Sequence, residues 1–134
     1  MNRIFDIASS ALAAQTIRLN TIASNVANAN TVAGSPDEVY RPRAPIFQAV
    51  LDGARTEGAA GVRVVDVVES DVPAVAHFRP DHPLADENGN VFAPDIEVMR
   101  EYADLVSASR TYETNVEIID TTRQLLLKTL QLGR

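Results

Sequence analysis

The placement of helix-breaking residues is the feature that most constrains the fold of this 134-residue chain. All seven prolines and five of the six glycines lie between Gly34 and Pro94. Residues 1–33 and 95–132 therefore contain neither of the two residues that most strongly interrupt helices. This partition predicts two long, uninterrupted terminal helices around a middle segment rich in turns.

The N-terminal segment carries an apolar stripe at alternating spacings of three and four residues, the pattern of a coiled coil. The stripe consists of Phe5, Ala8, Leu12, Leu19, Ile22 and Val26, with Gln15 in its one polar position. The C-terminal segment repeats the pattern with Val98, Tyr102, Leu105, Tyr112, Val116, Ile119, Leu126 and Leu130. We expect the two stripes to pack on each other.

The second helix is expected to begin after Asp95 as its N-cap and to end near Gly133. At about 1.5 Å per residue it would be roughly 55 Å long, which exceeds the span of a compact domain of this size. The middle segment reads as β structure, with candidate strands at residues 45–51, 61–70 and 91–93 and a hairpin turn at Asn88-Gly89.

The expected fold class is therefore α+β. Two long terminal helices pair as a coiled coil, and a small Pro/Gly-rich β domain is inserted between them. We expect residues 1–33 and 95–134 to form the coiled-coil assembly domain and residues 34–94 to form the β-rich outer domain.

The terminal helices lack the charged outer face of a typical soluble helix. Residues 1–33 carry three charges, and the side opposite the apolar stripe displays short uncharged side chains, including Thr21, Ser24, Asn25 and Asn28. Residues 124–132 carry one charge, Lys128, and their leucines surround the helix axis. Such surfaces are normally buried, so we expect neighbouring subunits to cover them and the protein to polymerise. A core helix in an ordinary globular domain is the alternative for either helix alone.

Composition and motifs argue against other classes of function. The net charge is −6 without a basic cluster, which disfavours nucleic-acid binding. No apolar run is long enough to span a membrane. His77 and His82 lack metal-ligand spacing, and the segment from Asp86 to Asn90 resembles a calcium loop only in its first residues. With no nucleophile beside a base and no phosphate-binding motif, we expect no enzyme activity, no cofactor and no small-molecule substrate.

Three stretches of the sequence resemble the bacterial flagellar rod and hook family. They are RIFDIASSALAAQTIRLNTIASNVANANT at residues 3–31, PLADENGNVFAPDIEV at 83–98 and SASRTYETNVEIIDTTRQLLLKTLQLG at 107–133. The resemblance covers essentially the whole chain and is loosest over residues 31–80. Within the family, the pattern is most similar to subunits of the proximal rod.

The resemblance implies a structural subunit of the periplasm-spanning driveshaft, which transmits torque and surrounds the export channel. It further implies export through the flagellar type III apparatus without a cleaved signal peptide, and terminal helices that are disordered in the free monomer. The implied partners are other copies of the chain, other rod proteins, the protein at the junction of rod and membrane ring, and the export apparatus.

The residues expected at subunit interfaces share a place on the terminal helices. They are Phe5, Leu12, Leu19, Ile22, Ser24, Asn25, Val26, Asn28, Asn30, Tyr102, Leu105, Tyr112, Asn115, Val116, Ile119, Leu126 and Leu130. A soluble coiled-coil binding module, such as an export chaperone or adaptor, is the alternative function. That alternative predicts charged outer faces, which the first helix lacks.

Overall fold

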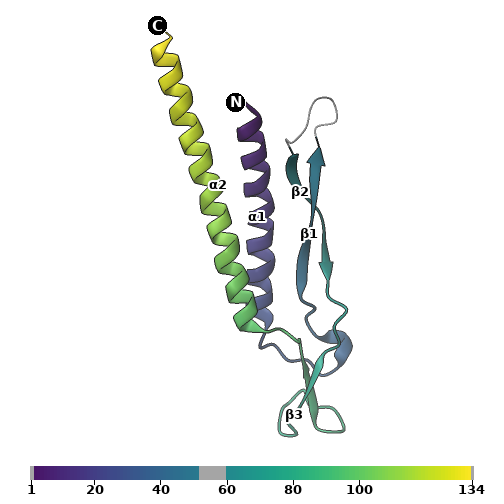
Figure 1. Ribbon diagram of the computed structural model, residues 1–134. Coiled ribbons are helices and arrows are strands. Elements are labelled where there is room, and N and C mark those ends of the chain that lie inside the picture. The colour runs from purple at the N-terminus through teal and green to yellow at the C-terminus, as the bar shows by residue number, and fades with distance from the viewer. Residues whose placement is uncertain (1, 52–59, 134) are drawn as a thin grey trace.

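Two long helices run side by side in opposite directions and form the spine of the molecule (Figure 1). The computed structural model describes residues 2–51 and 60–133. Helix α1 spans Asn2–Asn28 and helix α2 spans Val98–Leu132, 27 and 35 residues respectively. At 1.5 Å per residue, these lengths are about 40 and 52 Å. The C-terminal end of α2 therefore projects beyond the start of α1 (Figure 1).

A β-hairpin lies along α1 on the side away from α2 (Figure 1). Its strands, β1 (Arg43–Leu51) and β2 (Ala60–Glu69), pair antiparallel, with Arg43 opposite Glu69 at the base. The register shifts between Ile46 and Phe47, where β2 carries one residue more than β1. Such a bulge bends a hairpin and increases its twist.

A second, smaller sheet lies beyond the end of the helical pair where α1 stops and α2 starts (Figure 1). Strand β3 (Val75–Phe78) pairs antiparallel with β4 (Asn90–Ala93), and Ala33 adds a bridge to Phe92. A short 3₁₀ helix, Pro36–Glu38, precedes the first hairpin. The side chain of Val91 is fully buried.

The core is narrow and consists mainly of small side chains. Helix α1 is in contact with α2 on one side and with β1 and β2 on another. Ala8, Ala14 and Ile22 are buried on α1, and Ala108 is completely buried on α2. Small residues let helix and hairpin backbones approach closely, and they bury little apolar area in doing so.

The structure confirms the expected fold class: two paired terminal helices with small antiparallel sheets between them. The expected strands at 45–51, 61–70 and 91–93 correspond to β1, β2 and β4. Gly133 is the C-cap of α2, and its N–H donates to the carbonyl of Thr129.

Helix α1 ends at Asn28, close to the Asn30-Thr31 end that the sequence indicates, and the backbone N–H and the hydroxyl of Thr31 both donate to the carbonyl of Asn28. Two other local features differ from the expectation. The N-cap of α2 is Glu97 rather than Asp95, since residues 94–97 are not helical. Strand β3 was not predicted, because VAHF is short and all four of its residues are exposed.

The turn at Asn88-Gly89 exists, but it lies within a longer connection from β3 to β4 rather than in a two-residue hairpin. The N–H of Gly89 donates to the carbonyl of Asp86 at 2.9 Å. Gly89 has a φ of 77°, a conformation that favours glycine. A side-chain carbon added there would lie 3.0 Å from the ring of Phe78.

Candidate assembly surface

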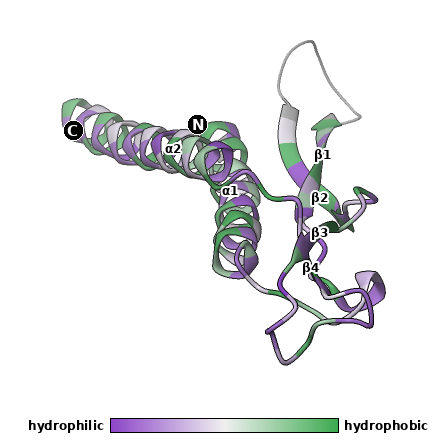
Figure 2. Ribbon diagram, turned by 90° about the horizontal axis from the view of Figure 1, so that it is seen from below, coloured by the Kyte–Doolittle hydropathy of each residue, from purple (hydrophilic) through white to green (hydrophobic). Residues whose placement is uncertain are grey.

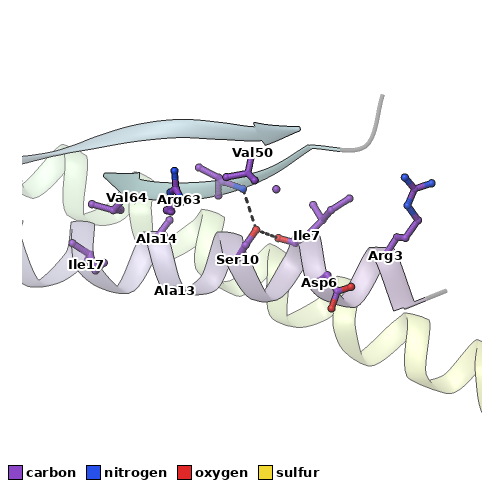
Figure 3. Close-up of a pocket in the computed structure, with 12 residues that line it drawn as sticks. Arg3, Asp6, Ile7, Ser10, Ala13, Ala14, Ile17, Val50, Arg63 and Val64 are labelled. Atoms are coloured by element: carbon purple, nitrogen blue, oxygen red, sulfur yellow. Dashed lines mark hydrogen bonds between the residues drawn. The ribbon is translucent and has the colours of Figure 1, made fainter. Parts of the chain in front are cut away.

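Helix α1 presents a second stripe to the hairpin, distinct from the apolar stripe found in the sequence. Its residues also recur at spacings of four and three; they are Arg3, Ile7, Ser10, Ala14 and Ile17. The hydroxyl of Ser10 accepts the N–H of Val62 on β2 at 3.1 Å and donates to the carbonyl of Ile7 at 2.7 Å (Figure 3). A side-chain carbon at Gly61 would lie 3.1 Å from the same oxygen, so glycine permits this close approach.

An open groove of about 590 Å³ lies between this stripe and the hairpin (Figure 3). Ile7, Ile17 and Val50 line it and are partly exposed to solvent. The hairpin thus covers its side of α1 incompletely.

A cluster of polar side chains joins α1, β1 and α2 at the opposite end of the hairpin. The carboxamide of Asn25, 3% exposed, accepts the N–H of Arg43 and donates to its carbonyl, each at 2.9 Å. Its oxygen also accepts the hydroxyl of Tyr40 at 2.9 Å, and its nitrogen donates to the carboxylate of Glu101 at 3.3 Å. The hydroxyls of Ser24 and Tyr40 are 2.9 Å apart.

The sequence missed the role of Tyr40, because nothing in its surroundings distinguishes it from an ordinary loop residue. The hairpin-facing stripe, in contrast, left a readable signal in its four-three spacing. That signal was hidden because Arg3, Ser10 and Ala14, which are charged, polar or small, are interspersed with the two isoleucines of the stripe.

The uncharged face that α1 leaves open is therefore not the one expected from sequence. Thr21 and Asn25 are buried, and Ser24 and Asn28 are half-buried. The exposed uncharged face lies between the α2 and hairpin sides; it comprises Ser9, Thr16, Asn20, Ala23 and Ala27. All five side chains are short, so another backbone could approach this face closely.

Helix α2 carries most of the exposed large apolar side chains of the helical pair. Within the described part of the chain, Ala108 and Thr122 are its only buried residues. Leu125 and Leu127 are more than half exposed, Leu130 is 68% exposed and Leu132 is 87% exposed. Apolar positions recur along α2 to its C-terminal end (Figure 2). Exposed apolar side chains concentrated on one element are typical of interaction surfaces.

The structure distributes the expected interface residues over three classes of exposure. Ile22 and Asn25 are buried. The half-buried ones are Phe5, Leu12, Leu19, Ser24, Val26, Asn28, Leu105, Asn115, Ile119 and Leu126. The exposed ones are Asn30, Tyr102, Tyr112, Val116 and Leu130. Asn28 and Asn115 donate to carbonyls within their own helices, Ser24 and Thr111 respectively.

One ion pair joins the two helices among the residues that the structure describes. Arg18 lies 3.7 Å from Asp104, and the other two pairs, Arg43–Glu69 and Arg100–Glu97, lie within the hairpin and at the start of α2. Partly exposed pairs of this type contribute little to stability. Charge therefore does not hold the helical pair together.

The described residues contain no cluster of acidic or histidine side chains able to hold a metal ion. The calcium-like segment forms a turn, in which the carboxylate of Asp86 accepts the N–H groups of Asn88 and Asn90. His82 accepts the N–H of Leu84 through Nδ1. None of the helices described is long and apolar enough to cross a lipid bilayer.

These features define an elongated structural subunit, with paired terminal helices whose apolar surface exceeds what the chain itself covers. Family models agree with this architecture at both ends. The model described as "Flagella basal body rod protein" matches residues 5–34, and that described as "Flagellar basal body rod FlgEFG protein C-terminal" matches residues 87–132.

Curated relatives extend the match over nearly the whole chain. The flagellar basal-body rod protein FlgC of Salmonella typhimurium is 46% identical over 98% of this chain and 96% of its own length. The FlgC proteins of Yersinia enterocolitica and Buchnera aphidicola subsp. Schizaphis graminum are 45% and 33% identical, over 98% and 97% of this chain and 96% of their own lengths.

This chain belongs to the FlgC family of flagellar basal-body rod proteins. It is a structural component of the rod rather than an enzyme, and membership of the family implies assembly with other rod components. The relatives give no support to the alternative of an export chaperone or adaptor.

Proposed function

We propose that this chain is a proximal-rod subunit that assembles through its terminal helices. Residues 1–33 and 95–134 form the inner layer around the export channel, and residues 34–94 form the outer domain. The observation that carries the proposal is the exposed leucine surface of α2, where Leu130 and Leu132 are 68% and 87% exposed. Removing apolar area from water contributes about 25 cal/mol per Å², and the surplus over the entropic cost of association stabilises an assembly.

The arrangement of the exposed surfaces favours an open polymer over a closed dimer. The leucine-rich end of α2 projects past the start of α1, whereas the short uncharged side chains of Asn20 and Ala27 lie on α1 itself. When two different surfaces of one subunit meet, the contact is head-to-tail and generates rings or helical filaments. A rod built this way can be stiff enough to transmit torque.

The proposed partners are other copies of this chain, other rod proteins, the protein at the junction of rod and membrane ring, and the flagellar type III export apparatus. The first three would cover the helix faces that the chain leaves open. The export apparatus would act earlier, on the unfolded chain, without a cleaved signal peptide.

The double substitution Leu127→Lys with Leu130→Lys tests this proposal. Both side chains are exposed within the chain, at 51% and 68%, and lysine is a good helix former, so the subunit is expected to fold normally. In the bacterium lacking the native gene, the variant is expected to abolish swimming and to be absent from purified basal bodies.

Val72→Lys is the matched control, because Val72 is 54% exposed but lies outside the helices. It is expected to support swimming. Normal incorporation of the double variant into basal bodies would contradict assembly through the end of α2.

A further inference from the structure

The hydrogen-bonding capacity of Asn25 is fully used within its own chain. A carboxamide offers two N–H donors and an oxygen that accepts two hydrogen bonds. The donors go to the carbonyl of Arg43 and the carboxylate of Glu101, and the oxygen accepts from the backbone of Arg43 and the hydroxyl of Tyr40. With a side chain that is also 3% exposed, Asn25 has neither the surface nor the polar groups to contact a neighbouring subunit.

The carboxamide of Asn25 bonds to the backbone of β1 in the way that a neighbouring β-strand would. In an antiparallel pair, the N–H and C=O of one residue lie on the same side of the strand. The sheet has two strands, so the second edge of β1 is free. Arg43 directs both groups from that edge to Asn25, while its neighbour Pro42 accepts the N–H of Ser70 at the end of β2.

Among the described residues, side chains of α1 hydrogen-bond the backbone of the hairpin at two places, once at one and twice at the other. Near the far end of the hairpin, Ser10 accepts one backbone bond from Val62 beside an open groove. At the base, Asn25 makes two backbone bonds to β1 and links the same point to Tyr40 and to Glu101 of α2. Of these two attachments, only the one at Asn25 connects α1, β1 and α2.

We propose that Asn25 is a positioning residue that fixes the orientation of the β1–β2 hairpin relative to the helical pair. It acts through the backbone of Arg43 rather than through contact with another subunit. The fixed orientation presents the hairpin in the geometry that the rod requires. Only this last step depends on the proposed function.

The orientation can be measured by spin-label distances in the full-length chain. The sequence contains no cysteine, so Glu113→Cys on α2 and Val65→Cys on β2 provide two unique labelling sites, both exposed. The parent is expected to give a narrow distance distribution. Asn25→Ala and Asn25→Asp are expected to broaden it at least about twofold, because loss of buried hydrogen bonds frees the base of the hairpin.

Asn28→Ala is the matched control, since Asn28 donates only to the carbonyl of Ser24 in its own helix. Its distance distribution is expected to equal that of the parent. If Asn25→Ala and Asn25→Asp also give the parent distribution, the proposal is wrong.

A second substitution separates hydrogen bonding from simple space filling. Asn25→Asp keeps the size of the side chain but places a carboxylate against the carbonyl of Arg43 and the carboxylate of Glu101. Adding Glu101→Gln supplies a donor and removes one negative charge, but it restores no donor for the carbonyl of Arg43, so it is expected to recover only part of the narrow distribution. A space-filling role predicts that Asn25→Asp alone behaves like the parent.

Two further results, a failure of Asn25→Ala to fold and a loss of swimming without a change in distances, also decide whether the proposal is right. If Asn25→Ala does not fold, Asn25→Asp, which keeps the size of the side chain but cannot donate to the carbonyl of Arg43, serves alone; a broadened distribution then supports the proposal, and the parent distribution overturns it. If Asn25→Ala abolishes swimming without altering the distances, Asn25 acts at a subunit contact and the proposal fails, while assembly through the terminal helices stands.

Discussion

The two ends of the helical pair are built on opposite principles. At the junction end, where α1 stops and α2 starts, Ile22, Thr21 and Asn25 are buried and the carboxamide of Asn25 is saturated with hydrogen bonds. At the distal end, α2 extends beyond its partner helix and Leu130 and Leu132 are exposed. The polar cluster at the junction end is satisfied within the chain, although Met99 and Tyr102 at the start of α2 are 74% and 47% exposed. The leucines of the distal end are left uncovered by the chain, and we propose that assembly covers them.

This difference assigns separate tasks to the two ends. A segment with satisfied polar groups and buried contacts is ordered in the free subunit, whereas a helix without tertiary burial is marginal in water. The junction end can therefore set the shape of the subunit before assembly. The distal end supplies exposed apolar surface, which on the proposed function becomes ordered and buried when neighbouring subunits bind.

The largest expected difference between the ends comes from charge substitutions. Ile22→Asp places a carboxylate at a position that is 5% exposed and is expected to destabilise the monomer by about 3 kcal/mol or more. Leu130→Lys, at a position 68% exposed, is expected to change stability by less than about 0.5 kcal/mol. Urea unfolding of both variants measures their free energies of unfolding. Equal losses of stability would contradict the difference between the two ends.

A smaller effect is expected midway along α1, at Gln15. Its Oε1 atom is buried and has no hydrogen-bond partner among the residues that the structure describes. Gln15→Leu removes this polar atom at nearly constant volume and is expected to stabilise the monomer by about 1 kcal/mol. The midpoint of thermal unfolding would rise; a lower midpoint would mean that the amide is satisfied in solution.

The smallest effect is expected from the ion pair between the helices. Arg18 and Asp104 are 3.7 Å apart, and their side chains are 27% and 49% exposed. Arg18→Ala is therefore expected to cost less than about 0.5 kcal/mol, because water and salt screen such pairs. A loss above that value, sensitive to salt, would show that charge does contribute to pairing of the helices.

The fold was predictable because its strongest signals are local. The absence of proline and glycine from both ends marked the helices, and valine-rich alternation marked β2. The asparagine-rich run indicated the end of α1 near Asn30-Thr31, and the bonds from Thr31 to Asn28 lie at that point. Strand β3 was missed because its pairing with β4, rather than its own composition, makes it a strand.

The candidate surface was predictable only in part. Leucines around α2 correctly indicated apolar surface that the chain does not cover, as their exposure shows. The sequence does not show that the hairpin covers Thr21 and Asn25 on the uncharged face of α1. A helical projection contains only residues of the helix, and the hairpin is remote from them in sequence. Asn25 illustrates the limit: its partner Arg43 is 18 residues away and contributes only backbone atoms, which sequence patterns do not encode.

Amide hydrogen exchange along α2, in the free monomer and in purified rods, tests the central claim most directly. In the monomer, amides at residues 101–108 are expected to exchange at least about 100-fold more slowly than those at residues 127–132, since Ala108 is fully buried whereas every residue from 127 to 132 is exposed. In the rod, both segments are expected to be slow. Uniformly slow exchange along α2 in a confirmed monomer would contradict the account.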